Sequence, residues 1–580
     1  MNSVRSTAAA FLCALGVACG SEPSGPDNGA GTPPPGPVIP PDQTSGCSQP
    51  TAITLSPGGH SIIDPAASNG CIRIPEAGTV GAEHVVVALA TNGRETSSGV
   101  SVSYDLRGTP TLLTTTAAAE TSALPRELDP TLGKFAGPLK QEAFHQLLRA
   151  KERVLSKYPV PSFNRSPTAF NVSVPPVVGD KRTFKVCSTD QCSSFVDVTA
   201  TVQHIGPKGA IYLDDTVPDG GYTPADISAV GALFDNYLYP IDTTSFGRES
   251  DLDNNGVVVV LLTDQVNNLS GNCNAAGSVI LGYFFGNDLL PGQTGSNGGE
   301  VFYGLVPNPN SSTCTIHRDF ANELLAPTFI HEFQHMISFN QHVLLRGGFS
   351  EDTWLNEGLS HFAEELGGRQ IPDALCHNQD CFTQFAAGDA SNAYRYLTDP
   401  EAHFLVEPGS SGGTLGERGA NWLFVRWVVD HFGGDVTGAA FTRSLVATTR
   451  LGADNVAGAT GVPFSTLTPE WQLANYLDNL PDFAPGSGRL QYSSWNFRLT
   501  FASFHDQAPG AFPVPYPLVP DSTRTGVYSR QGTLRAGSGP HLRVIQSANG
   551  NAVTVQLTDG TRNPIGSSSA APRLAIARIR

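Results

Sequence analysis

Short apolar runs and amphipathic stretches alternate along the chain and mark regions of different structure. In the first part, the runs HVVVALAT, VSVSYDL, RTFKVCS and SSFVDVTATVQHI have the length and the β-branched content of strands. Between the second and third of these runs, residues 137–158 predict a helix, which Pro159 ends. We therefore expect a β-rich N-terminal region over 47–205 with a helical connector. The sequence leaves open whether this connector belongs to a pro-segment.

The pattern changes near residue 209. The runs GAIYLDD and GVVVVLLTD are continuously apolar, as in central strands that are buried on both faces. From about 485 the strand pattern returns in HLRVIQS, NAVTVQLTDG and PRLAIARIR. We therefore expect a central domain over 206–485 and a C-terminal β-rich domain over 486–580. Helices are predicted in the central domain at 223–241, 321–345, 352–367, 417–433 and 464–480.

The first 19 residues have the pattern of an export signal. Arg5 is the only charge before an apolar stretch from Ala8 to Ala18, which is too short to span a bilayer stably and is typical of a removable signal peptide. The run LGVAC resembles a lipoprotein processing site, in which Cys19 is the lipidated residue. Gly16 departs from this pattern, because Leu is preferred three residues before the Cys. The alternative is cleavage nearby and a freely secreted protein.

Residues 20–46 are rich in Pro, Gly and Ser. Such chains extend and bury no core, so we expect a tether between the signal and the folded protein. No later apolar run has the length of a transmembrane helix. We therefore expect an exported protein that is either attached to the bacterial cell envelope through its lipid alone or secreted.

Composition narrows the range of partners. Of the 580 residues only 15% are charged, and the formal net charge is −17. Affinity for nucleic acid comes mainly from Lys and Arg on phosphates, so we do not expect this acidic chain to bind nucleic acid.

Cysteine usage agrees with export, because disulfides persist in oxidising compartments. Beyond Cys13 and Cys19, the remaining cysteines fall into sequence-local pairs. We expect disulfides in that order, although connectivity does not follow from sequence alone. The expected pairs are Cys47 with Cys71, Cys187 with Cys192, Cys273 with Cys314, and Cys376 with Cys381.

The segment APTFIHEFQHMISFNQH has the spacing of a metal site. On a helix, His331 and His335 share one face and can bind one Zn²⁺, while Glu332 projects near the metal and can act as general base. The apolar flanks indicate a buried helix, in which paired histidines need a partner. The alternative is a helix whose two histidines face solvent or are hydrogen-bonded in the core.

A third ligand is available in TWLNEGLSHFAEEL on the next predicted helix. Glu357 would complete a set of two His and one Glu, which leaves the fourth zinc position open, as catalysis requires. Glu364 lies two turns further along the same face and is expected to accept the free ring N–H of a ligating histidine. Asn356 is a second candidate for that role.

These motifs carry a family resemblance. HEFQHMISF followed by TWLNEGLSHFAEEL resembles the gluzincins, which are zinc peptidases with a Glu ligand, and more closely the hyicolysin family of bacterial neutral metallopeptidases. AIYLDD, VVVVLLTD, GYFFGNDLLP, EVFYGLVP and WQLANYLDNL are also similar, so the resemblance covers about 209–480. It implies an α+β, multidomain protein with a gluzincin-type zinc peptidase core. That core has a small mixed sheet plus a mainly helical half, flanked by N-terminal and C-terminal β-rich, sandwich-like domains.

The resemblance also implies a mechanism, in which zinc activates a water that attacks the peptide bond. Glu332 would take the proton of this water and deliver it to the leaving amine. A Tyr or His normally stabilises the oxyanion, but no Tyr lies between His335 and Glu357. The candidates for this role are His361, Tyr394, Tyr396 and His403.

A second metal site is indicated by the alternating oxygen donors of Asp251, Asp253 and Asn255, which Gly256 follows. This is the spacing of a Ca²⁺ loop, so we expect a structural Ca²⁺ here. The acidic last ligand of the helical Ca²⁺ loop is missing, because Leu262 occupies its place. The alternative is an Asx-rich turn before a buried strand.

Three functions remain open. The first is a monomeric, exported zinc endopeptidase that hydrolyses extracellular proteins or peptides. The second is an aminopeptidase, since W-L-N-E-G also occurs in such exopeptidases; the acidic segment that would bind a substrate's terminal amine is missing, and Glu300 is only a weak substitute. The third is a surface adhesin or carbohydrate-binding protein with a residual peptidase core, and the presence of Glu332 argues against it.

Overall fold

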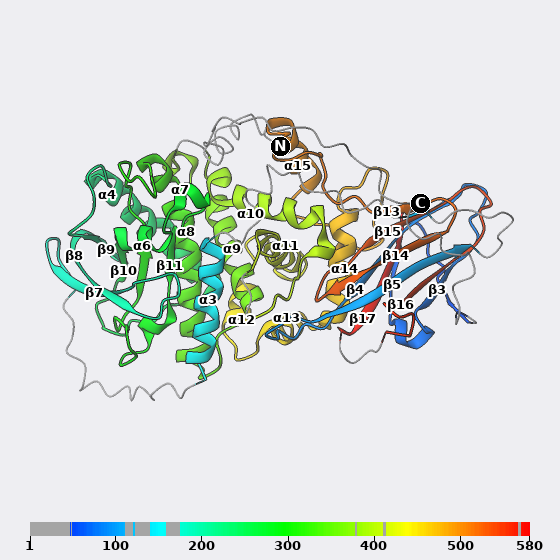
Figure 1. The fold of residues 1–580 in the computed structure, drawn as a ribbon, viewed down its shortest axis with the longest axis horizontal. Helices are drawn as coiled ribbons and strands as arrows, with labels where there is room; N and C mark the ends of the chain where they lie inside the picture. Colours follow the sequence, from blue (N-terminus) through cyan, green and yellow to red (C-terminus); the bar gives the residue numbers. More distant parts are fainter. Residues whose placement is uncertain are drawn as a thin grey trace, which may run out of the picture.

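The structure is a computed structural model in which sheets and helices alternate along an elongated molecule (Figure 1). A sheet with its helices lies at one end, helices fill the middle, and two further sheets lie at the other end. The expected signal peptide with Cys19 and the expected tether lie outside the described residues. The described residues are 47, 49–110, 120–121, 140–157, 175–377, 380–409, 413–565 and 570–580.

The first sheet has the strand order β11-β12-β10-β9-β8-β7. β9, β10 and β12 are parallel neighbours, and β11 pairs with β12 in antiparallel fashion at the edge. The predicted strand at VVVVLLTD is therefore central, and each residue of β10 is buried. The bounds are β7 (Lys181–Cys187), β8 (Phe195–Ile205), β9 (Gly209–Asp214), β10 (Val258–Leu262), β11 (Gly282–Phe284) and β12 (Val301–Gly304).

Helices pack beside this sheet and fill the middle of the molecule. α8 contacts β11 and β12, and α9, α10 and α11 pack against one another. The long helices are α3 (Lys140–Leu155), α8 (Arg318–Phe339), α9 (Thr353–Gln370), α10 (Cys381–Thr398), α11 (Leu415–Phe432) and α14 (Phe464–Leu477). The shorter ones are α4 (Pro224–Leu233), α5 (Tyr239–Phe246), α6 (Asp264–Leu269), α7 (Cys273–Ala276), α12 (Ala439–Val446), α13 (Gly452–Thr460) and α15 (Phe497–Gln507).

The other two sheets have the orders β1-β3-β16-β5-β14-β6 and β13-β15-β4-β17-β2. Each sheet combines strands from both ends of the chain. The N-terminal strands are β1 (Thr51–Ala52), β2 (His60–Ile63), β3 (Cys71–Ile74), β4 (Ala82–Ala90), β5 (Ser101–Pro110) and β6 (Glu120–Thr121). The C-terminal strands are β13 (Asp521–Thr523), β14 (Tyr528–Arg535), β15 (His541–Gln546), β16 (Val553–Asp559) and β17 (Pro572–Arg578).

This pairing differs from the expected division into separate β-rich regions over 47–205 and 486–580. β17 lies between β2 and β4, and β16 lies between β3 and β5. β7 and β8 were expected in the N-terminal region, but they extend the sheet of the central region because β8 pairs with β9. Periodicity predicts that a segment is a strand, whereas the choice of partner depends on long-range packing, which periodicity does not encode.

β4 explains how the paired sheets attach to the helices. Val86, Ala88 and Ala90 face the other sheet, whereas Val85 and Val87 belong to the core that the helices share. Alternate residues of a strand point to opposite faces of the sheet. The one apolar run of β4 therefore contributes side chains to two hydrophobic cores. The run HVVVALAT is therefore buried on both faces rather than half-exposed.

The region after 485 contains a helix as well as strands. α15 was not among the predicted elements, because FRLTFASFHDQ is short and lacks a long apolar repeat. The structure joins the cysteines as expected from their order: Cys47–Cys71, Cys187–Cys192, Cys273–Cys314 and Cys376–Cys381.

We expect Ile576→Ala to lower the free energy of unfolding by about 2–5 kcal/mol, because Ile576 is fully buried between the two sheets. Since β17 pairs with β2 and β4, amide exchange should accelerate in these N-terminal strands as well. Denaturant unfolding and hydrogen exchange measure the two effects. Val80→Ala is the control, because Val80 is 91% exposed and should leave both unchanged. Exchange that accelerates only in the C-terminal strands would contradict the pairing.

Candidate metal centre

Helix α8 brings the predicted motif together. His331, Glu332 and His335 are all buried, and the Nε2 atoms of the two histidines lie 3.2 Å apart. Residues four apart share one face of a helix, so local geometry alone sets this spacing.

Helix α9 adds the carboxylate. Glu357 Oε2 lies 3.4 Å from His331 Nε2 and 3.7 Å from His335 Nε2. In a tetrahedral zinc site with bonds of about 2.0–2.1 Å, the donor atoms lie about 3.3 Å apart. The three distances among the donor atoms of His331, His335 and Glu357 are close to this value. Both oxygens of Glu357 are buried and have no hydrogen-bond donor among the described residues. A buried carboxylate without donors fits a metal ion, because an unpaired buried charge is otherwise costly.

Gly358 lets α9 approach its neighbour closely. A Cβ atom at this position would lie 2.8 Å from Asn421 O and 2.8 Å from a methyl carbon of Val425 on α11. The glycine in W-L-N-E-G therefore has a packing reason, and it helps to place Glu357 beside α8.

A second layer of contacts orients the histidine rings. His331 Nδ1 lies 2.8 Å from Glu364 Oε1, as the sequence predicts, and His335 Nδ1 lies 3.0 Å from Ser360 Oγ. Ser360 donates its own hydroxyl proton to Gln334 Oε1 at 2.5 Å, so its oxygen is free to accept the ring N–H. Both Nδ1 atoms then carry the proton, and both Nε2 lone pairs face the centre.

Ser360 was not predicted, although it follows Glu357 by three residues on the same face. Asn356 does not have the predicted role. Its backbone oxygen lies 3.1 Å from Ser360 Oγ, and its side-chain oxygen has no hydrogen-bond donor among the described residues. The reason is helical geometry, because Asn356 and Glu357 are adjacent and so point to different sides of α9.

We expect Glu364→Ala to weaken zinc binding by about 10–100-fold, because the ring of His331 loses its acceptor. Competition with a chelator of known affinity measures the change. Gln370→Ala is the control on the same helix, since Gln370 is exposed and should leave the affinity unchanged. Equal affinities of the Glu364→Ala and Gln370→Ala variants would contradict this role for Glu364.

The protonation of the two histidines differs in the metal-free protein. Burial and the charge of Arg149 lower the pKa of His335 to about 3, so its ring is neutral. Burial would also lower the pKa of His331, but the nearby carboxylates of Glu357 and Glu364 raise it to about 9. A metal that binds at neutral pH must therefore displace a proton from His331.

Of the four candidates for oxyanion stabilisation, His361 lies near the motif. Its ring centroid is 4.8 Å from that of His331, and its Nδ1 is 2.8 Å from Asp389 and 2.9 Å from Glu364. Burial favours the neutral ring, but Asp389 and Glu364 hold the pKa of His361 well above its ordinary value. His361 is therefore a buried cation beside the histidine pair.

The other three candidates have partners elsewhere, which corrects their assignment. Tyr394 donates its hydroxyl proton to Val514 O at 2.8 Å, and the hydroxyl of Tyr396 lies 2.9 Å from Ser538 Oγ. His403 Nδ1 lies 3.2 Å from Thr414 Oγ1. α10 turns the side chains of Tyr394 and Tyr396 towards the C-terminal segment, and His403 lies beyond the end of α10, against the start of α11.

Arg418 on α11 is a neighbour of the centre that sequence reasoning missed. Its Nε lies 4.0 Å from Glu357 Oε2 and donates to Glu142 at 2.6 Å, while its Nη1 donates to Glu407 at 2.8 Å. Burial would raise the pKa of Glu357, but the charge of Arg418 and the two histidines hold it well below its ordinary value. No spacing in the sequence links α11 to the motif, so only the fold reveals this contact.

His145 on α3 is a further missed neighbour. Its ligand atom and those of His331, His335 and Glu357 all lie within 4.8 Å of one another, and all four residues are buried. The predicted helix over 137–158 is present as α3, but its place beside the motif did not follow from its sequence.

Glu332 is held on two sides. Its Oε2 accepts a hydrogen bond from Phe284 N at 2.8 Å, and its Oε1 lies 2.9 Å from His145 Nε2. Burial alone would raise the pKa of Glu332, but the nearby histidines hold it at about 2. The carboxylate is therefore charged and oriented, as a base requires.

The predicted Ca²⁺ loop forms a separate acidic group. Carboxylate oxygens of Asp251, Asp253 and Glu300 lie within 4.8 Å of one another. Asn255 lies in the same loop, where its side-chain oxygen accepts from Val257 N and its amide donates to Asp253. Glu300 accepts a bond from Leu252 N at 3.1 Å in this loop, and it is not among the residues grouped around His331.

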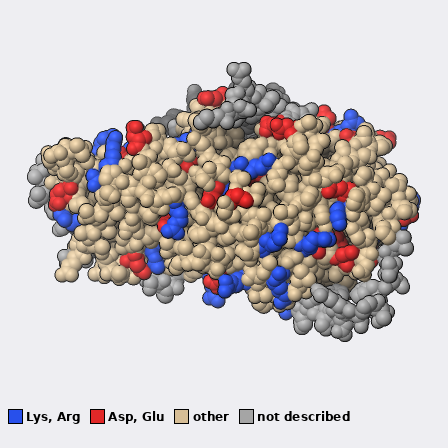
Figure 2. Space-filling model, turned by 180° about the vertical axis from the view of Figure 1, so that it is seen from behind, with Lys and Arg blue, Asp and Glu red and all other residues tan. Residues whose placement is uncertain are grey.

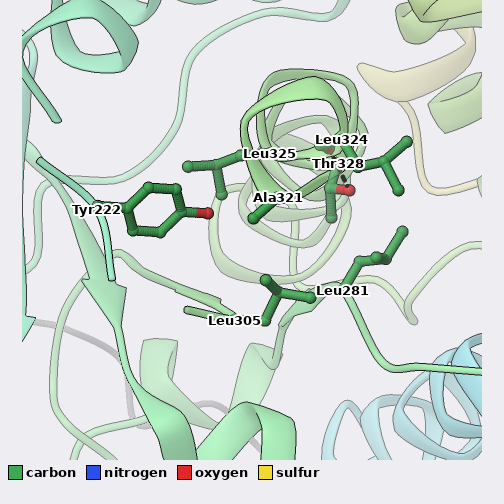
Figure 3. Close-up of a pocket in the computed structure, with 7 residues that line it drawn as sticks. All are labelled: Tyr222, Leu281, Leu305, Ala321, Leu324, Leu325 and Thr328. Carbon is green, nitrogen blue, oxygen red and sulfur yellow. Dashed lines mark hydrogen bonds between the residues drawn. The ribbon is translucent and has the colours of Figure 1, made fainter. Parts of the chain in front are cut away.

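A small apolar hollow lies near the N-terminal half of α8, where Thr328 is one turn before His331 (Figure 3). Its lining carries no charge. Its lining residues are Tyr222, Leu281, Leu305, Ala321, Leu324, Leu325 and Thr328. On the face drawn in Figure 2, acidic and basic side chains are interspersed and much of the surface carries neither.

Comparison with known proteins supports a metallopeptidase relationship. The chain is 30% identical over 213 residues to "Neutral metalloprotease ShpI" of Staphylococcus hyicus. The matched part is 37% of this chain and 44% of that protein, so the chain spans less than half of the relative's length. No family model matches the chain.

Proposed function

We propose that the protein is a zinc-dependent endopeptidase whose metal is held by His331, His335 and Glu357. The observation that carries the proposal is the buried set of two imidazole nitrogens and one carboxylate oxygen at 3.2, 3.4 and 3.7 Å from one another. Two His and one Glu are the donors of catalytic zinc sites that keep one position open. The similarity to a neutral metalloprotease adds independent support.

When bound, zinc supplies a Lewis acid that polarises the scissile carbonyl and acidifies water. Glu332, charged and anchored by Phe284 N, takes a proton on its carboxylate and returns it to the leaving amine. Glu364 and Ser360 fix the rings of the two histidines. His361, as a buried cation, is our candidate for stabilising the developing oxyanion.

The remaining assignments are proposals of the same kind. We infer peptide or protein substrates, a monomer, and export with Cys19 as a lipid anchor or with free secretion. An aminopeptidase is the second candidate, but Glu300 binds within the acidic loop and offers no support for a terminal-amine pocket. Asp251, Asp253 and Glu300 form a candidate structural Ca²⁺ site.

Cleavage of unfolded casein, with fragments read by mass, tests the proposed function. We expect internal cuts that a chelator abolishes and added zinc restores, because the base has no activated water without the metal. Release of terminal residues alone would favour the aminopeptidase. Zinc-loaded protein that cuts nothing, both unmodified and with the two substitutions His145→Ala and Arg149→Ala on α3, would contradict the proposal.

A further inference from the structure

Helix α3 lies beside the edge strand β11 and the helices α8 and α9 (Figure 1). An exposed edge strand has unpaired backbone groups that can bind an extended peptide. Here side chains of α3 form hydrogen bonds with these backbone groups. Gln141 Nε2 donates to Gly282 O at 2.9 Å, and Gln141 Oε1 accepts from Leu281 N at 2.7 Å. One side-chain amide thus makes both bonds that a peptide unit would make.

The same pattern continues along β11. Arg149 donates to Phe284 O at 2.8 Å, and Glu152 accepts from Gly286 N at 2.7 Å. Phe284 N donates to Glu332. Five backbone groups between Leu281 and Gly286 are therefore bonded to side chains of α3 and of the motif, which leaves them unavailable to a substrate chain.

His145 reaches the metal centre from the middle of α3. Its Nε2 lies 2.9 Å from Glu332 Oε1 and 3.3 Å from Gly282 O. Its ring centroid is 5.4 Å from that of His331. His145 therefore lies beside the three donors, with its ligand atom within 4.8 Å of theirs, and is in contact with the general base.

We propose that His145 is the fourth protein donor of the metal centre in the intact chain, and that α3 thereby holds the peptidase latent until the helix is displaced. This inference rests on the proposed function. Zinc with four protein donors has a closed, structural coordination sphere, whereas catalysis needs one position for water or substrate. In this proposal α3 fills the open zinc position, contacts the general base Glu332 and occupies the edge strand. It therefore blocks water activation, proton transfer and substrate binding.

The buried face of α3 is mostly polar, which makes displacement of the helix less costly. Of its eight buried side chains, only Phe144 and Leu148 are apolar. The others bond to groups that water or a substrate can satisfy, such as Glu142 with Arg418 at 2.6 Å. Buried ion pairs contribute little net stability, because desolvation offsets their attraction. Displacing α3 therefore costs less than removing an apolar helix of the same length.

Zinc K-edge X-ray absorption of the intact, zinc-loaded protein counts imidazole ligands and tests the coordination directly. We expect three imidazoles and one carboxylate in the intact protein, and two imidazoles, one carboxylate and water in the His145→Ala variant. Gln146→Ala is the matched control, because Gln146 is a buried polar residue of α3 that donates to Pro408 O; it should keep three imidazoles. Two imidazoles in the intact protein would overturn the proposal without any variant.

Activity on a fluorogenic peptide tests latency. We expect the double variant His145→Ala, Arg149→Ala to cut at least about tenfold faster than the intact protein, because a larger fraction has an open centre. Equal rates, with zinc bound in both, would reject latency and leave the proposed function intact. If the double variant binds no zinc or fails to fold, the absorption spectrum of the intact protein still decides. If neither form binds zinc or cuts, the proposed function itself fails.

Discussion

Replacing Glu332 by Gln is expected to lower the rate of peptide hydrolysis by about 10²–10⁴-fold. The amide has the same shape and can still contact Phe284, but it cannot take a proton from water. Glu332 is fully buried, and the histidines around it favour its charged form, so the variant loses the charge that takes the proton. Steady-state rates of the His145→Ala, Arg149→Ala double variant, with and without Glu332→Gln, measure the effect.

The same substitution should leave the metal in place, because Glu332 is not one of the donors. Zinc content near one ion per chain would separate loss of the base from loss of the site. Glu323→Gln is the matched control, since it makes the same chemical change on α8 away from the motif. Unchanged hydrolysis in Glu332→Gln would reject Glu332 as the base.

Replacing Glu357 by Gln should have the largest effect on metal binding. Structural zinc sites bind with roughly 10–16 kcal/mol over four ligands, so one ligand contributes about 3 kcal/mol, or about 10²-fold in affinity. The amide also removes the negative charge that balances the metal. In consequence, the same zinc concentration should raise the melting temperature of the unmodified protein more than that of the variant, by an amount equivalent to about 2.7 kcal/mol for a 100-fold loss of affinity, because a ligand stabilises only the state that binds it.

Thermal unfolding with and without zinc measures this difference. Glu407→Gln is a demanding control, because Glu407 is also a fully buried carboxylate bonded to Arg418 but is not one of the donors. Its variant should melt at a lower temperature yet keep the zinc-dependent increase. If zinc stabilises the Glu357→Gln variant as strongly as the unmodified protein, Glu357 is not a ligand.

Sequence reasoning predicted the parts of this centre that depend on helical geometry. His331, Glu332 and His335 lie within one turn or so, and Glu364 follows Glu357 by seven residues on one helix. The structure brings all five together. Ser360 belonged to the same face and could have been found by the same argument.

Contacts between distant segments were beyond that reasoning. His145 precedes His331 by 186 residues in the printed sequence, and Arg418 lies on a third helix, so no local period relates either residue to the motif. The strand partners of β2, β4 and β17 were missed for the same reason. Such contacts depend on which apolar faces pack together, and many pairings satisfy the same alternating pattern.

Anomalous diffraction above and below the zinc edge, from crystals of the zinc-loaded protein, tests the metal centre most directly. We predict one strong peak about 2 Å from the Nε2 atoms of His331 and His335 and from a carboxylate oxygen of Glu357. A zinc peak elsewhere, or one in this group with Glu357 turned away from it, would contradict the account.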